Sequence, residues 1–90
     1  MSCETPQCRK VRALVSELYR ERNEPPCTVL DIVGSLDVQV NVQGEGNEVR
    51  SLTLVSLASD TLPSEVREVV SDFVRNPATR RYDCISRSYQ

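Results

Sequence analysis

The stretch from Leu36 to Leu57, LDVQVNVQGEGNEVRSLTLVSL, decides the fold of this chain. In its first half aliphatic and polar residues alternate, so a strand here places the aliphatic side chains on one face and the polar ones on the other. Two glycines in the polar tip, Gly44 and Gly46, supply the positive φ angles that a hairpin loop of this length needs. The stretch therefore predicts a β-hairpin with one apolar face and one polar face.

The returning half of the hairpin has a less regular pattern. Leu52 and Leu54 share one face of the predicted strand, whereas Val49, Val55 and Leu57 share the other. A β-bulge, or burial of both faces at the far end of the strand, would reconcile the two phases.

Two amphipathic helices flank the predicted strands. The first is predicted from Thr5, a good N-cap followed by proline, to about Arg22. The second follows the polar segment 59–61 and ends at Asn76-Pro77, because proline cannot continue a helix. Its apolar residues recur at helical spacings: Leu62, Val66, Val69, Val70, Phe73 and Val74.

The remaining segments complete an α-β-β-β-α order. Residues 27–33 are apolar at both parities and predict a strand, and residues 80–89 predict either a final edge strand or a mobile tail. We expect an α+β fold of two layers, with an antiparallel meander of about three strands, a fourth C-terminal edge strand as an open alternative, and both helices on one face of the sheet. The opposite face then stays exposed and available to a partner protein. Its predicted binding residues are Asp37, Gln39, Asn41, Gln43 and Arg50.

The length of 90 residues predicts a single domain over 1–90, with residues 1–4 and 86–90 as flexible ends. A domain of this size buries little apolar surface, and at least one predicted edge strand carries no guarding lysine or proline. A homodimer would bury more apolar surface and would cover the unguarded edge, so we expect self-association through the face or the edge of the sheet.

The composition argues against enzyme chemistry. The chain has no histidine, which removes the commonest general base and the commonest zinc ligand. No nucleotide-binding loop stands out, since Gly44-Glu45-Gly46 precedes no helix and its glutamate would repel an anion. We expect no catalytic residues, no cofactor and no bound metal.

The four cysteines leave several states open. No export signal or membrane-spanning run is visible, so we expect an intracellular protein in which Cys3, Cys8, Cys27 and Cys84 stay unpaired. The alternatives are a Cys3 to Cys84 or Cys8 to Cys27 disulfide, or a structural zinc site, which the spacing does not favour. A zinc- or disulfide-stabilised structural module is accordingly one alternative function.

A second alternative is binding to duplex RNA or DNA. The element order resembles that of double-stranded-RNA-binding domains, and two basic clusters are present: Arg9, Lys10 and Arg12 in the first helix, and Arg80 and Arg81 after the second. The likeness covers element order alone. That family grips the phosphate backbone with a lysine-rich helix start, whereas the corresponding segment 59–65 is acidic here.

The leading hypothesis is therefore a non-catalytic protein-interaction or regulatory module. The net charge of −2 does not attract a polyanion by itself, and the solvated polar face suits a protein partner. Short length, arginine and serine richness and the absence of enzyme motifs are also typical of a viral or phage accessory protein that binds a host or structural partner.

Overall fold

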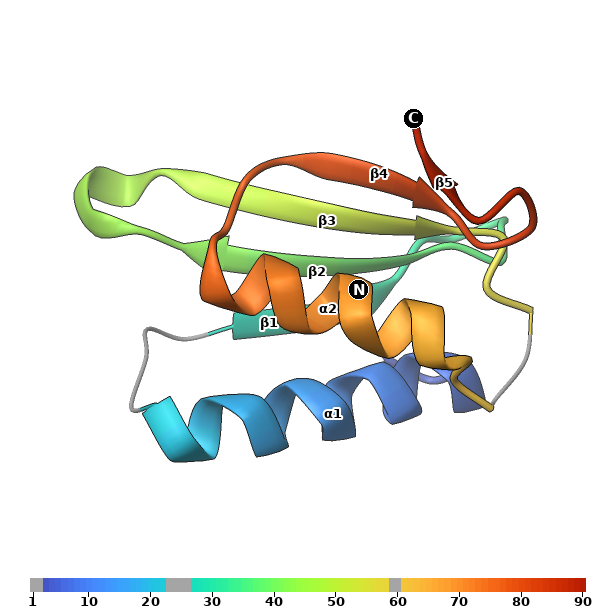
Figure 1. Ribbon diagram of the computed structural model, residues 1–90, viewed down its shortest axis with the longest axis horizontal. Helices are drawn as coiled ribbons and strands as arrows, with labels where there is room; N and C mark the ends of the chain where they lie inside the picture. The colour runs from blue at the N-terminus through green and yellow to red at the C-terminus, as the bar shows by residue number, and fades with distance from the viewer. Residues whose placement is uncertain (1–2, 23–26, 59–60) are drawn as a thin grey trace.

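Both helices lie on one face of a single sheet in the computed structural model, which describes residues 3–22, 27–58 and 61–90 (Figure 1). The elements in chain order are α1 (Pro6–Arg22), β1 (Cys27–Asp31), β2 (Val38–Gln43), the short 3-10 helix η1 (Glu45–Asn47), β3 (Val49–Val55), α2 (Ser64–Arg75), β4 (Arg80–Asp83) and β5 (Ser88–Tyr89). The predicted α+β class and the helix and strand order are confirmed.

The five strands follow one another across the sheet in sequence order, β1-β2-β3-β4-β5. The first three form the predicted antiparallel meander. β4 pairs parallel to β3, because α2 carries the chain back along the sheet before β4 begins. The sheet is therefore mixed, and its last edge is the two-residue strand β5, which pairs antiparallel to β4.

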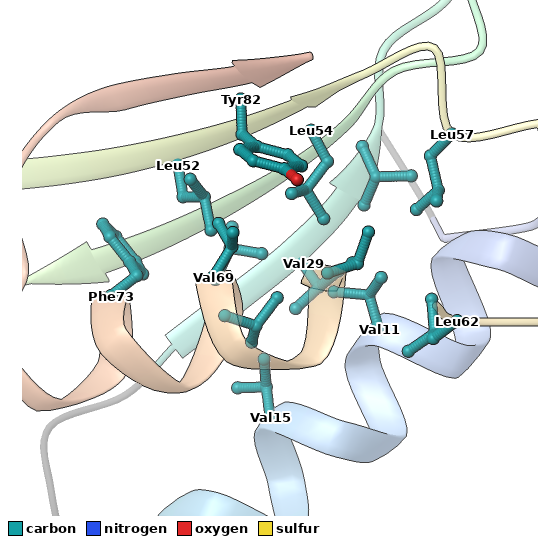
Figure 2. Close-up of a cluster of buried hydrophobic side chains, with 14 of the residues drawn as sticks. Val11, Val15, Val29, Leu52, Leu54, Leu57, Leu62, Val69, Phe73 and Tyr82 are labelled. Carbon is teal, nitrogen blue, oxygen red and sulfur yellow. The ribbon is translucent and has the colours of Figure 1, made fainter. Parts of the chain in front are cut away.

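The alternation in β2 works as the sequence predicts. Val38, Val40 and Val42 are buried against the helices, and the register sets Val38 opposite Leu54 and Val40 opposite Leu52. Figure 2 shows Leu52, Leu54 and Tyr82 reaching from the sheet toward the two helices. They meet Val69 and Phe73 of α2 and Val11 and Val15 of α1 in one hydrophobic core.

The pairing of β3 with β2 runs without interruption from Val49 to Leu54. Just beyond it the register slips by one residue at Ser56, whose φ of 60° lies in the left-handed region, so the β-bulge, one of the two predicted alternatives, occurs at this end of the strand. This turn brings Leu57 into the core and lets its N–H donate to the carbonyl of Leu36 at 2.9 Å. Val49 keeps the phase of the outer face and stays exposed.

The start of α1 is fastened to the end of β1. Thr5 caps the helix, because its Oγ1 accepts a hydrogen bond from the N–H of Cys8 at 3.2 Å. The same hydroxyl donates to Asp31, and the N–H groups of Glu4 and Thr5 donate to Asp31 Oδ2 at 2.7 and 3.1 Å. Asp31 thus accepts three hydrogen bonds from the segment before α1, a link that the sequence pattern does not reveal.

The two ends of α2 differ. The helix starts at Ser64, later than the polar segment 59–61 indicates. Its N-cap is Pro63, which provides no side-chain hydrogen bond to the first turn. Residues 59 and 60 of that segment lie outside the described residues. The C-terminal end is as predicted, since Asn76 is the C-cap and its N–H donates to the carbonyl of Asp72 at 3.0 Å.

Among the C-terminal residues 86–90, predicted to be flexible, Ser88 and Tyr89 form the edge strand β5. The N–H of Gln90 donates to the carbonyl of Arg81 at 2.8 Å, and its side chain donates to Asp83 Oδ2 at 3.0 Å. The ring of Tyr89 also contacts the ring of Tyr82 edge to face, with centroids 5.3 Å apart. Side-chain contacts of this kind are not visible in a polar sequence of low periodicity.

We predict that Asp31→Asn lowers the free energy of unfolding by about 1 kcal/mol at neutral pH, because a charged acceptor of three hydrogen bonds is lost. Partial burial acts to raise the pKa of the Asp31 carboxyl, but the hydrogen bonds from Thr5 and Glu4 and the charge of Arg9 outweigh it and lower this pKa. The contribution of the carboxylate is therefore complete above the pKa of the unfolded chain and is lost as the pH falls through the lower folded pKa.

Urea denaturation at about pH 7 and about pH 2.5 measures this dependence. The difference between the wild-type protein and Asp31→Asn should shrink in acid. Asp72→Asn, which changes an exposed carboxylate on α2, is the control and should alter stability by less than about 0.5 kcal/mol. An Asp31→Asn deficit of equal size at both pH values would contradict the role assigned to the carboxylate.

Candidate functional site

The face of the sheet turned away from both helices is the candidate site, and we call it the outer face. Its members follow from the register, since paired residues share a face: Thr28 and Leu30 of β1, Gln39, Asn41 and Gln43 of β2, Val49, Ser51, Thr53 and Val55 of β3, and Arg81 and Asp83 of β4. Both described helices lie on the opposite side (Figure 1). The outer face is thus available to a partner.

The centre of the outer face is polar but uncharged. Ser51 Oγ donates to Asn41 Oδ1, and Asn41 Nδ2 donates to Gln39 Oε1 at 3.4 Å. These bonds join side chains of β2 and β3 and restrict their movement. Thr53, in the middle of the face, is buried between its cross-strand neighbours Gln39 and Arg81.

The predicted binding residues separate into three groups. The structure places Gln39, Asn41 and Gln43 together on the outer face. Asp37 immediately precedes β2, and its Oδ1 accepts a hydrogen bond from the N–H of Ser56 at 3.0 Å and so supports the turn after β3. Its carboxylate has a structural task.

The placement of Arg50 on the polar face is wrong. Arg50 pairs with Val42, so it lies on the side of the sheet that carries the helices, near the hairpin tip. There it forms an ion pair with Glu48, with 3.0 Å between Nη2 and Oε2. Arg50 is an even number of positions from Leu52 and Leu54, so the strand alternation already indicates that it shares their face.

Sequence reasoning missed a set of exposed aliphatic side chains at one end of the sheet. Val33 and Leu36 in the connection between β1 and β2, and Ile85 in the connection between β4 and β5, are 85%, 52% and 78% exposed. Figure 1 shows both connections at the same end of the sheet. The sequence did contain a signal for the exposure of two of them, because Val33 and Leu36 flank the turn residues Gly34 and Ser35.

The cysteines do not behave as predicted. Cys3 and Cys8 form a disulfide with a Cα separation of 5.4 Å, which corrects both the expectation of four unpaired cysteines and the proposed Cys3 to Cys84 and Cys8 to Cys27 pairs. Cys8 sits in the first turn of α1, and the chain before the helix folds back within disulfide reach of it. Among the described residues no group of three or more metal-ligating side chains occurs.

Cys27 and Cys84 are free thiols. Burial raises the pKa of Cys27 to about 11, although a hydrogen bond with Tyr19 opposes the rise. Burial, with the charges of Asp83 and Asp37, raises the pKa of Cys84 to about 11 as well. A nucleophilic cysteine needs the opposite shift, so neither thiol is activated.

The two basic clusters do not form one stripe. Arg9, Lys10 and Arg12 belong to α1, in the helical layer. Arg80 and Arg81 point to opposite faces of β4, and the guanidinium of Arg80 lies over the Tyr89 ring at 5.7 Å from its centroid. The arrangement does not favour a continuous phosphate-binding surface.

An open groove of about 360 Å³ lies where α1 meets the start of α2. Its walls include Leu14 and Leu62, and its charged side chains are Lys10, Glu17 and Arg67. A general acid and base pair of carboxylates needs two such groups in a water-excluding pocket, and Glu17 is one carboxylate beside two cations. The residues that line the groove therefore do not include such a carboxylate pair.

None of the described helices is long and apolar enough to cross a bilayer. Comparison of the chain with protein-family models, with curated proteins and with solved structures gave no match.

We predict that the native protein has two free thiols, Cys27 and Cys84, which react slowly with a thiol reagent. Reduction of the Cys3–Cys8 disulfide should release two further thiols. With a pKa of about 11, only about one thiol in a thousand is ionised at pH 8, and the thiolate is the reacting form. Ellman's reagent should therefore label Cys27 and Cys84 much faster in denaturant than in the folded protein. Equal labelling rates in the two conditions would contradict their placement.

Proposed function

We propose that the chain is a non-catalytic protein-interaction module that forms a homodimer through the outer face of its sheet. The observation that carries the proposal is the outer face itself, which no described helix covers and whose central side chains are uncharged. The centres of protein interfaces are depleted of charged residues, so this composition suits a protein partner better than a polyanion.

Self-association is favoured by the charges at the margin of the outer face. Arg81 and Asp83 carry opposite charges two positions apart on β4 and point to the same side. A two-fold axis in the plane of the interface that crosses β4 near Tyr82 sets Arg81 of one copy against Asp83 of the other, twice. The two sheets then pack face to face at the usual spacing of about 10 Å.

The size of the domain supports the same proposal. A chain of 90 residues buries a modest apolar area, and a second copy adds burial without a larger core. The raised pKa values of Cys27 and Cys84 and the single carboxylate in the groove between the helices support a non-catalytic role.

Equilibrium sedimentation at micromolar concentration tests the homodimer. We expect a species of about twice 10.1 kDa for the wild-type protein and a monomer for Gln39→Lys, because the lysine brings an unpaired positive charge into the centre of the interface, on the same face as Arg81. Val49→Lys, at an exposed aliphatic residue of the same face, is a second variant that does not disturb the core.

Asp72→Asn is the matched control, since it changes the net charge by the same amount as either lysine variant but lies on α2. It should sediment as the wild-type protein does. A wild-type species of 10.1 kDa throughout the concentration range, or dimers that persist in both lysine variants, would refute the proposed interface.

A further inference from the structure

A second surface, separate from the outer face, is the free edge of β1. Ile32 N–H donates to the carbonyl of Asp37 at 3.1 Å, so Ile32 and every second residue before it turn their backbone groups toward β2. Cys27, Val29 and Asp31 have the opposite parity and turn their N–H and C=O groups away from the sheet. No described residue forms a backbone hydrogen bond with these groups. Neither lysine nor proline occurs within β1 to guard this edge.

One flank of α1 borders this edge along its length. The helix runs antiparallel to β1: Thr5 and Arg9 are close to Asp31 at one end, and Tyr19 forms a hydrogen bond with Cys27 at the other. The opposite flank, with Lys10, faces α2 across the groove between the helices. The flank with Tyr19 therefore overlooks the free edge.

Arg12 supplies a positive charge to the same flank. It lies seven positions before Tyr19, which is two helical turns, and therefore shares its side of α1. It falls between the two anchored ends, alongside Val29, and its side chain is exposed. The described salt bridges do not include Arg12.

We propose that the edge of β1 and the flank of α1 with Arg12 and Tyr19 form a docking site for an extended, acidic peptide segment of a partner protein. The segment adds to the sheet as a sixth strand, and its backbone pairs with Cys27, Val29 and Asp31. Alternate side chains of the segment point toward α1, and a carboxylate opposite Val29 meets Arg12. The charge at Arg12 selects an acidic segment over a basic one.

The experiment is an NMR titration with a capped heptapeptide of alternating threonine and valine that carries glutamate at its centre, so that the glutamate and the two valines share one face. The control peptide has lysine in place of the glutamate. We expect larger amide shift changes at Cys27, Val29 and Asp31 than at Thr28 and Leu30, and an affinity about fivefold higher for the glutamate peptide. In Arg12→Glu, which leaves β1 unaltered, the preference should reverse toward the lysine peptide.

Shift changes that avoid β1, or equal affinities of both peptides for the wild-type protein and Arg12→Glu, would overturn the docking site. Gln39→Lys separates this test from that of the homodimer, because the substitution lies on the outer face and should leave peptide affinity unchanged. If Gln39→Lys is monomeric and still binds the glutamate peptide at β1, both surfaces are supported. If the wild-type protein dimerises but the peptide does not bind, the docking site alone fails.

Discussion

The β2–β3 ladder is the constraint on which the rest of the structure depends. Its uninterrupted register aligns two aliphatic rows, so that Val38 and Val40 of one strand and Leu52 and Leu54 of the other lie fully buried on a single face. A one-residue shift of either strand would transfer these side chains to solvent. Because the apolar rows share one side, both helices must pack there, and the other side of the sheet has no covering element among the described residues.

The exposed surfaces are consequences of this one-sided packing. The outer face carries Gln39, Asn41 and Thr53 because every second residue of β2 and β3 points away from the helices. The edge of β1 is open because α1 is fastened at Asp31 and Tyr19 over the helix-facing side of the strand and does not pair with it. A domain with one small core thus presents two surfaces of different chemistry, one with an uncharged centre and one bordered by arginine.

Local sequence pattern predicted much of the fold. The alternation of β2, the proline at the start of α1 and the spacing of Val66, Val70 and Phe73 in α2 are all short-range signals, and the structure confirms each of them. The features that sequence reasoning missed depend on contacts between distant segments. In the sequence Asp31 is an ordinary strand residue, and its hydrogen bonds appear only when the start of α1 is placed beside it. The Cys3–Cys8 disulfide likewise depends on the path of the chain just before the helix.

The candidate site was predictable only where parity decided it. Gln39, Asn41 and Gln43 follow from the strand period, and the same period places Arg50 with Leu52 on the opposite face. The free edge of β1 needed the strand order, which periodicity does not contain. The parallel pairing of β4 likewise depends on where α2 returns the chain.

The central claim, that the sheet is sealed on one side and open on the other, is tested most directly by comparing aspartate at two successive positions of β2. Val40 is fully buried and Asn41 lies on the outer face, so urea denaturation should report a loss of about 3 kcal/mol or more for Val40→Asp and of less than about 1 kcal/mol for Asn41→Asp. Losses of similar size at both positions would contradict the account.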